Sequence, residues 1–361
     1  MPCSLIVPKK TRLHLDSYTA DLRSGQVDPG KRLTDSLRKA HPGEITAEQL
    51  LAALLDTKEP CIFAESAVCG DGSDWTLREL ALLGDLSVAT DVTVFDDGRH
   101  RDPTPHPVPF PATLVFTPGA LLRNECGHPP ADWAEVTTAS GQLDPAGFAA
   151  LYFRRLRPVF AYIQAHATQL GVRAFVTVPG LGCGQFAGPF RGQLGTQLEK
   201  VLESLLAEYA LSWPALRAVY YDAYSECSPG RARHHDTDFL VRPLNKTPGG
   251  GRPQLCSPKD YAEDPDDDFS TCRLYSLVAW DHVSWPGNDF NAGSRATDDG
   301  VKAAATSALH SLTGIEGSYD KASHAYLPPF PAKTWSDLLR NQGFPVLTQF
   351  TPNSPYWGHA P

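Results

Sequence analysis

Ala174-Phe-Val-Thr-Val-Pro-Gly-Leu-Gly-Cys-Gly-Gln-Phe-Ala-Gly188 is the stretch of this 361-residue chain that decides its fold. Residues 174–178 are apolar and rich in β-branched side chains, which predicts a short buried strand. Residues 179–188 carry four glycines, which predicts a tight loop, and residues 193–209 have the apolar spacing of a helix. A strand that passes through a glycine-rich loop into a helix is the basic unit of an α/β fold.

The same alternation continues on both sides of this unit. Further strands are predicted over residues 92–95, 112–116, 216–221 and 275–280, and further helices over residues 148–170 and 300–312. We therefore expect an α/β fold with three layers, α/β/α, around a mixed central sheet. Ligands of such sheets bind beyond the carboxyl ends of the strands, so a site is expected in the loops after residues 178 and 280. The proline-rich residues 103–111 are expected to form a rigid loop.

The sequence outside this core predicts an extension, an insertion and a tail. Residues 1–86 are expected to form an N-terminal helical extension, in which Thr46-Ala-Glu-Gln49 is a capping box at the start of an apolar helix. Residues 87–325 are expected to be the main α/β domain, which carries the expected site. It would be interrupted at about 228–271 by a polar surface insertion rich in proline, glycine and aspartate. Residues 326–361 are expected to be a proline-rich tail packed on the domain.

The composition limits the class of function. Hydrophobic residues make up 42% and charged residues 20%, which is typical of a folded globular chain. The net charge of -9 argues against a general nucleic-acid binder, although backbone amides can still build a phosphate pocket. No apolar stretch is long enough to cross a bilayer and no secretory signal is visible, so we expect a cytoplasmic protein without nucleic-acid or membrane partners. The eight cysteines are scattered without a CxxC motif, so we expect reduced thiols.

The glycines of residues 179–188 favour phosphate binding. Glycine has no side chain, so successive N–H groups can approach an anion closely, and the next helix adds the positive end of its dipole. The spacing matches neither the GxxxxGK[ST] nor the GxGxxG nucleotide motif. On spacing alone, a tight turn without a ligand remains the alternative interpretation.

The loop after residue 280 is rich in carboxylates. It reads Asp281-His-Val-Ser-Trp-Pro-Gly-Asn-Asp-Phe-Asn-Ala-Gly-Ser-Arg-Ala-Thr-Asp-Asp299, and we call it the acidic loop. Breaking a glycosidic bond requires a carboxylate that activates water or stabilises an oxocarbenium-like centre. Each aspartate also has a structural interpretation, as a helix cap or a turn residue.

The glycine-rich stretch resembles the diphosphate loop of macrodomains and poly(ADP-ribose) glycohydrolases, in which a Gly-x-Gly-x-Phe-Gly-like run wraps the diphosphate of ADP-ribose. The resemblance implies a macrodomain-like fold, ADP-ribose as the ligand, and Phe186 packed on the distal ribose. The contacts with ADP-ribose that it implies come from Gly180, Leu181, Gly182, Cys183, Gly184, Gln185, Phe186, Asn288 and Asp298. Cys183 is expected to be a loop residue rather than a nucleophile, because no histidine lies near it in the sequence.

The acidic loop is similar to that of the MavL-like effector macrodomains, which remove ADP-ribose from arginine. The similarity lies in aspartates that replace asparagine and in the inserted Trp285-Pro-Gly-Asn-Asp289. It implies Asp281, Asp289 and Asp299 as catalytic residues and an arginine-ADP-ribosylated protein, with ubiquitin as one candidate, as substrate. Ordinary macrodomains place the corresponding segment before the diphosphate loop, so the order found here implies a permuted arrangement of strands.

The resulting prediction is an ADP-ribosylarginine hydrolase. The alternatives are a non-catalytic reader of ADP-ribose and a hydrolase of ADP-ribosyl esters or free ADP-ribose derivatives. A reader needs the diphosphate loop but no converging carboxylates, so the acidic loop favours an enzyme. No metal and no cofactor are expected. The acidic run at 264–268 lies in the polar insertion and is expected to be solvated surface. Arg233-His-His-Asp236 lacks the spacing of metal ligands, and Cys126-Gly-His128 has too few ligands for zinc.

Overall fold

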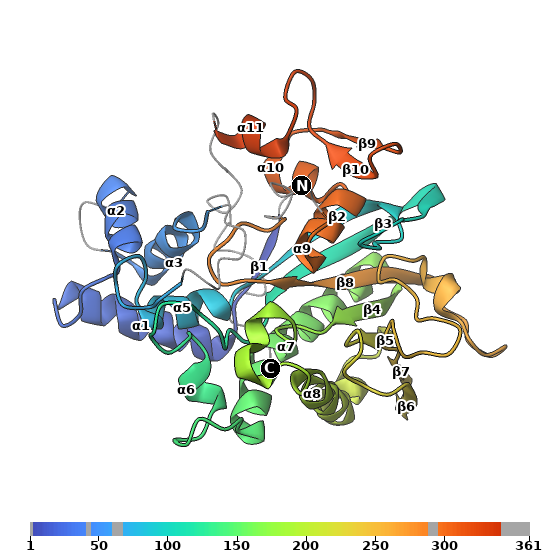
Figure 1. The fold of residues 1–361 in the computed structure, drawn as a ribbon, viewed down its shortest axis with the longest axis horizontal. Coiled ribbons are helices and arrows are strands. Elements are labelled where there is room, and N and C mark those ends of the chain that lie inside the picture. The colour runs from blue at the N-terminus through green and yellow to red at the C-terminus, as the bar shows by residue number, and fades with distance from the viewer. Residues whose placement is uncertain (1–2, 41–44, 60–67, 288–294, 341–361) are drawn as a thin grey trace.

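The computed structural model describes residues 3–40, 45–59, 68–287 and 295–340, which form three layers around an eight-stranded sheet (Figure 1). The strand order is β1-β2-β3-β8-β4-β5-β7-β6. The strands of this sheet are β1 Ser4–Ile6, β2 Ser87–Asp96, β3 Pro105–Pro118, β4 Arg173–Pro179, β5 Leu216–Asp222, β6 Gly230–His234, β7 Thr237–Val241 and β8 Cys272–Trp280. The five strands β3, β8, β4, β5 and β7 are parallel to one another, whereas the pairs β1–β2, β2–β3 and β6–β7 are antiparallel. The predicted mixed sheet is confirmed.

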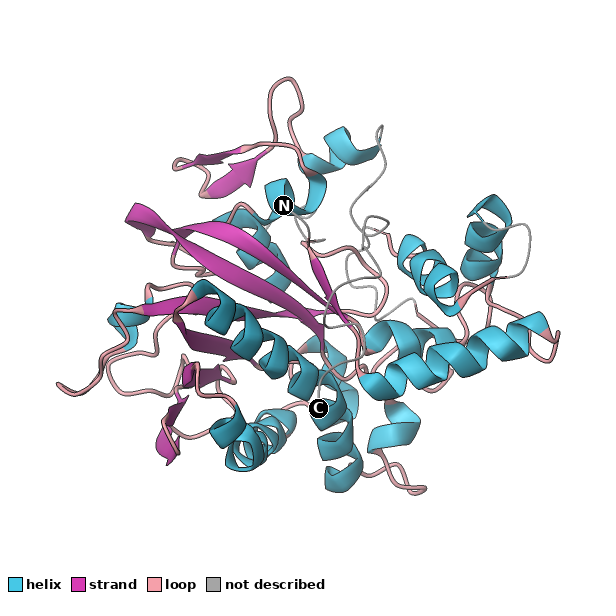
Figure 2. Ribbon diagram, turned by 180° about the vertical axis from the view of Figure 1, so that it is seen from behind, coloured by secondary structure: helices cyan, strands magenta, loops and turns pink. Residues whose placement is uncertain are grey.

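The helices lie on the two faces and at one end of this sheet (Figure 2). The α-helices are α1 Lys9–Arg23, α2 Lys31–Ala40, α3 Ala47–Asp56, α5 Leu77–Gly84, α6 Trp133–Val136, α7 Pro145–Leu170, α8 Leu194–Tyr209, α9 Asp298–Ala305, α10 Ala308–Thr313 and α11 Trp335–Arg340. The short 3-10 helices are η1 Gln185–Phe190, η2 Ala210–Ser212 and η3 Pro258–Tyr261, and a separate hairpin pairs β9 Ser318–Asp320 with β10 Ala325–Leu327. The helix expected over residues 300–312 is divided into α9 and α10.

The alternation of side chains along each strand produces two cores. Val176, Val178 and Val219 belong to the core that the sheet shares with α7 and α8. Phe175 and Tyr220 belong to the opposite core, which includes residues of the N-terminal helices and of α9 and α10. Both faces of the central strands are therefore buried, as expected for parallel strands between helical layers.

The parallel strands bring distant segments to one edge of the sheet. β3 ends at Pro118, β8 at Trp280, β4 at Pro179, β5 at Asp222 and β7 at Val241, and all five carboxyl ends point the same way. The glycine-rich loop and the acidic loop follow β4 and β8, which are neighbours in the sheet. Both loops therefore start from the same edge, where ligands of α/β sheets bind.

The N-terminal extension is helical apart from its first strand. Helices α1, α2, α3 and α5 gather at one side of the molecule, coloured blue in Figure 1. The predicted capping box is present, since Thr46 accepts from the N–H of Gln49 and Gln49 accepts from the N–H of Thr46. The expectation of a purely helical extension is wrong at Ser4–Ile6, which add an edge strand to the central sheet.

The proline-rich residues 103–111 are not the loop that the sequence predicted, because most of them belong to β3. Here β3 pairs only with β2, since β8 joins β3 from Ala112 onward. Prolines stand at every second position from 105 to 111, so the nitrogens without hydrogen all lie on one side of the strand. Proline is tolerated in a strand whose donor side has no partner.

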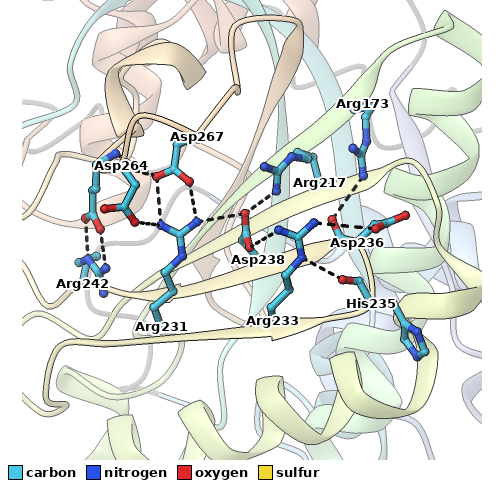
Figure 3. Close-up of polar contacts among 11 residues, drawn as sticks. Arg173, Arg217, Arg231, Arg233, His235, Asp236, Asp238, Arg242, Asp264 and Asp267 are labelled. Carbon is cyan, nitrogen blue, oxygen red and sulfur yellow. Dashed lines mark hydrogen bonds and ion pairs between the residues drawn. The ribbon is translucent and has the colours of Figure 1, made fainter.

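The expected surface insertion at 228–271 is also wrong in its first part. Residues 230–234 and 237–241 form β6 and β7 of the main sheet, and Phe239, Leu240 and Val241 are buried. Figure 3 shows Arg231 and Arg233 of β6 directed at Asp238, a buried carboxylate that Arg217 also contacts. Composition alone did not predict β6 and β7, because charged residues surround their short apolar run.

The expectation of reduced thiols is wrong for one pair of cysteines. Cys69 and Cys126 form a disulfide with a Cα–Cα distance of 5.5 Å. Tertiary packing brings together the segment before α5 and the loop after β3, which are 57 residues apart. Cys3, Cys183, Cys227, Cys256 and Cys272 are free. No helix in the described residues is long and apolar enough to cross a membrane.

Candidate functional site

The loops after β3, β4 and β8 meet at the carboxyl edge of the sheet. Gly119, directly after β3, donates its N–H to the Trp280 carbonyl at 3.3 Å. A Cβ on Gly119 would lie 2.3 Å from the Gly182 nitrogen, so only glycine allows the two loops to approach so closely. Gly119 thus touches the end of β8 and the glycine-rich loop together, which fixes the two predicted site loops relative to each other.

The glycine-rich loop has a buried part and an exposed part. Leu181 and Gly182 are buried, and the Tyr152 hydroxyl donates to the Leu181 carbonyl at 2.5 Å. Gly184 and Gln185 are exposed, and a Cβ on Gly184 would meet no atom within 4 Å. Of the predicted ADP-ribose contacts in this loop, Gly184 and Gln185 are therefore the most exposed.

Phe186 and Cys183 take different places in this loop. Phe186 is half-buried, and its carbonyl accepts the N–H of Leu122 from the loop after β3 at 2.9 Å. Cys183 is buried, and burial raises the pKa of its thiol well above the ordinary value. A thiol that stays protonated is a poor nucleophile, which agrees with the sequence-based expectation for Cys183.

Arg123 is a charged residue beside the glycine-rich loop that the sequence analysis did not single out. It follows β3, and its guanidinium donates to Gln185 Oε1 at 2.9 Å and to Glu125 Oε1 at 2.6 Å. It therefore places a positive charge beside the exposed part of the glycine-rich loop, where a diphosphate would need one. The sequence could have indicated Arg123 by its position shortly after a strand that ends at the ligand-binding edge.

Asp281 and Asp299 hold the two ends of the acidic loop. Asp281 Oδ1 accepts the N–H groups of Val283 and Ser284, each at 2.7 Å, and Asp281 Oδ2 accepts from the Ser284 hydroxyl. Asp299 is buried in the first turn of α9, and its Oδ1 accepts the N–H of Gly287 at 2.8 Å. Asp281 therefore makes turn interactions, whereas the N-cap of α9 is Thr297 and not an aspartate. The catalytic roles of Asp281 and Asp299 stay predictions.

Asp298 is paired with a buried lysine that the sequence reasoning did not single out. Its carboxylate accepts the N–H of Ala279 at 2.7 Å and lies 2.9 Å from Lys302 Nζ. Lys302 also donates to Gln254 Oε1 at 3.0 Å and to the Leu277 carbonyl. Burial lowers the pKa of Lys302, whereas the nearby Asp298 carboxylate raises it. Asp298, one of the predicted ligand contacts, therefore already accepts hydrogen bonds from Lys302 and Ala279.

Two of the predicted site residues, Asn288 and Asp289, lie outside the described residues. Their predicted roles in ADP-ribose binding and catalysis therefore rest on the sequence. Within the described parts of the chain, no group of three His, Cys, Asp or Glu side chains is arranged to hold a metal ion.

A buried group of charged side chains contacts the acidic loop. Arg155 of α7, which is 1% exposed, donates to Asp132 Oδ1 at 2.8 Å, to Asp85 Oδ1 at 3.2 Å and to the Gly119 carbonyl at 3.0 Å. His282 of the acidic loop reaches Asp132 Oδ2 through Nε2 at 3.1 Å. Burial alone would raise the pKa of Asp132, but Arg155 and His282 lower it well below its ordinary value.

This group joins parts of the chain that are distant in sequence. Asp85 ends the N-terminal extension, Asp132 follows β3, and His282 belongs to the acidic loop. A Cβ on Gly84 would lie 2.3 Å from His282 Nε2, so the end of α5 must be glycine for this contact to form. The extension, which carries no chemical motif in the sequence, therefore packs directly against the acidic loop.

The comparison with known families agrees with this arrangement. Residues 3–332 match the family model described as macrodomain effector MavL. Among curated proteins, none matches the chain. The match includes the N-terminal extension, the glycine-rich loop and the acidic loop, and it covers most of the 361 residues. The chain belongs to the MavL macrodomain effector family.

Proposed function

We propose that this protein is an ADP-ribosylarginine hydrolase, which releases ADP-ribose from arginine side chains of a modified protein. Membership of a macrodomain family supports a function related to ADP-ribose. The observation that carries the finer proposal is the meeting of an exposed glycine-rich backbone and a carboxylate-rich loop at one edge of the sheet. A binding module needs the first of these features, and a glycosidic hydrolase needs both.

The glycine-rich loop would hold the substrate. The diphosphate would rest on the backbone at 184–186 with the Arg123 guanidinium beside it, because N–H groups and arginine both bind phosphate oxygens well. Phe186 would pack against the distal ribose. Fixing the ADP-ribosyl group in this way reduces the orientational cost of the reaction.

The acidic loop would carry out the chemistry. Asp281 would accept from a ribose hydroxyl, and Asp289 and Asp299 would face the anomeric carbon and the guanidinium. One of these two carboxylates would orient or deprotonate water, and the other would pair with the cationic guanidinium, for which a carboxylate is the matching partner. Water adds to the anomeric carbon, the C–N bond breaks, and the guanidine leaves with the proton taken from water.

The test is product analysis with the purified full-length chain and proteins ADP-ribosylated on arginine, on glutamate or on serine. The proposal expects free ADP-ribose and unmodified arginine from the first substrate. Release from glutamate esters alone would assign the chain to ester hydrolysis. Binding of ADP-ribose without release from any substrate would make it a reader.

Gly184→Phe should abolish detectable ADP-ribose binding. The new side chain would project from an exposed position where a Cβ meets no protein atom, and would occupy the space expected for the diphosphate. Isothermal calorimetry of the wild type and the variant measures the effect. Gly230→Phe is the matched control, because a Cβ there also meets nothing within 4 Å. Equal affinities of Gly184→Phe and wild type would remove the glycine-rich loop from the binding site.

Arg123→Ala should weaken ADP-ribose binding about tenfold to a hundredfold, the usual range for losing hydrogen bonds to a charged group. The same calorimetry measures it. Arg101→Ala is the control, because Arg101 is an exposed arginine between β2 and β3 at the opposite edge of the sheet. If both variants bind like the wild type, Arg123 does not contact the ligand.

A further inference from the structure

Lys58 joins the N-terminal extension to the start of the acidic loop. It follows α3, is 2% exposed, and donates from Nζ to the His282 carbonyl at 2.6 Å. Its ammonium also lies 3.9 Å from the ring centroid of Trp280, the last residue of β8. A lysine is almost never fully buried without a partner, and these partners belong to the strand end and loop of the candidate site.

The backbone around Lys58 follows the acidic loop as a short parallel bridge. The N–H of Glu59 donates to the Val283 carbonyl at 3.0 Å, and the N–H of Trp285 donates to the Glu59 carbonyl at 3.2 Å. The indole of Trp285 donates to the Lys58 carbonyl at 2.7 Å. Both backbone and side-chain hydrogen bonds therefore attach the first part of the acidic loop to the extension.

We propose that Lys58 is a positioning residue of the hydrolytic site, whose ammonium holds the start of the acidic loop and thereby places the Asp281 carboxylate. This inference rests on the proposed function. Lys58 acts through the His282 carbonyl and the Trp280 ring and does not contact the substrate. The N-terminal extension is then part of the catalytic unit.

The charge on Lys58 is suited to respond to pH. Burial lowers its pKa to about 7, against the attraction of Asp281. Among other charged groups nearby, Glu59 is paired with Arg32 of α2, and the His282 imidazole is directed to Asp132. As pH rises through about 7, Lys58 loses its charge, its cation–π contact weakens, and so does its attraction to Asp281.

The effect of this titration on stability has the opposite direction. Because the folded pKa is below the unfolded one, the unfolded chain binds the extra proton between pH 7 and about 10.4. The contribution of Lys58 to stability therefore rises with pH in that window. A loss of activity above pH 7 that depends on Lys58 would thus not come from unfolding.

The test compares Lys58→Met and Lys58→Arg with the wild type, and Lys31→Met serves as an exposed control in the same extension. Single-turnover rates on ADP-ribosylated arginine are measured from pH 6 to 9. Lys58→Met should lower the rate at pH 6 by about tenfold to a hundredfold, the range for a displaced catalytic group, while ADP-ribose affinity stays nearly unchanged. The wild-type rate should fall above pH 7, whereas the rates of both variants should lack that step.

Hydrogen exchange separates this inference from the proposed function. In Lys58→Met, amides of residues 281–287 should exchange faster, with residues 174–179 of β4 unchanged. If exchange is faster in Lys58→Met but the wild type hydrolyses no arginine substrate, Lys58 does hold the acidic loop, and the proposed hydrolase function is wrong. Unchanged exchange, or a wild-type pH profile in Lys58→Met, would overturn the role of Lys58.

Discussion

Asp299→Asn should slow hydrolysis of ADP-ribosylated arginine by about a hundredfold or more, the scale of losing acid–base catalysis. Asp299 Oδ1 accepts the N–H of Gly287, and an asparagine oxygen can accept the same hydrogen bond. The substitution can therefore keep the hydrogen bond between Gly287 and α9 while it removes the negative charge. ADP-ribose binding should persist, because the glycine-rich loop is unchanged.

Rates of arginine release and ADP-ribose affinities measure this effect. Asp289→Asn is expected to behave in the same way, on the strength of the sequence. Asp266→Asn, which changes an exposed aspartate outside the acidic loop, is the control. If Asp289→Asn and Asp299→Asn both hydrolyse the arginine substrate at the wild-type rate, the roles assigned to these aspartates are wrong.

Arg155→Met should lower the free energy of unfolding by about 3–5 kcal/mol, the usual cost of removing one partner from a buried ion pair. The substitution leaves Asp132 buried, with His282 as its remaining side-chain partner. Asp85 keeps Arg154 and Thr11 as partners, so the loss is concentrated at Asp132. Denaturant unfolding at pH 7 measures the difference.

The pH dependence identifies the cause of this loss. In the wild type the pKa of Asp132 is depressed, so its contribution is present above about pH 4 and is lost as pH falls through the folded pKa. Without the guanidinium, burial raises that pKa, so the penalty in Arg155→Met is relieved as Asp132 takes up a proton. The difference from wild type should therefore shrink between pH 7 and pH 4.

Arg157→Met is the matched control for Arg155→Met. Arg157 lies on the same helix, half-buried, with its guanidinium 4.7 Å from the ring centroid of Tyr209. Its loss should cost clearly less than the loss of Arg155, because Arg157 is half-buried whereas Arg155 is fully buried beside two carboxylates. A similar loss in both variants, or one that does not change with pH, would mean that the charge on Asp132 is not the cause.

The central unit of the fold was predictable because its signals are local. The apolar run at 174–178, the glycines after it and the helix periodicity at 193–209 each specify their own conformation, and the structure has β4, the glycine-rich loop and α8 there. The carboxyl-edge rule then placed both loops correctly at one edge. Prediction failed at β6, β7 and the start of β3, where partner strands override local composition.

The sequence by itself therefore determined the α/β alternation, the glycine-rich loop and the acidic loop. Only the tertiary structure decided which residues contact these loops. Arg123 donates to Gln185, Lys302 donates to Asp298, and Lys58 donates to the His282 carbonyl. Lys58 and His282 are 224 residues apart in the chain. No periodicity or motif in the sequence indicates such a pair. The pair forms only when the hydrophobic effect packs the extension against the sheet, where each buried charge requires a polar partner.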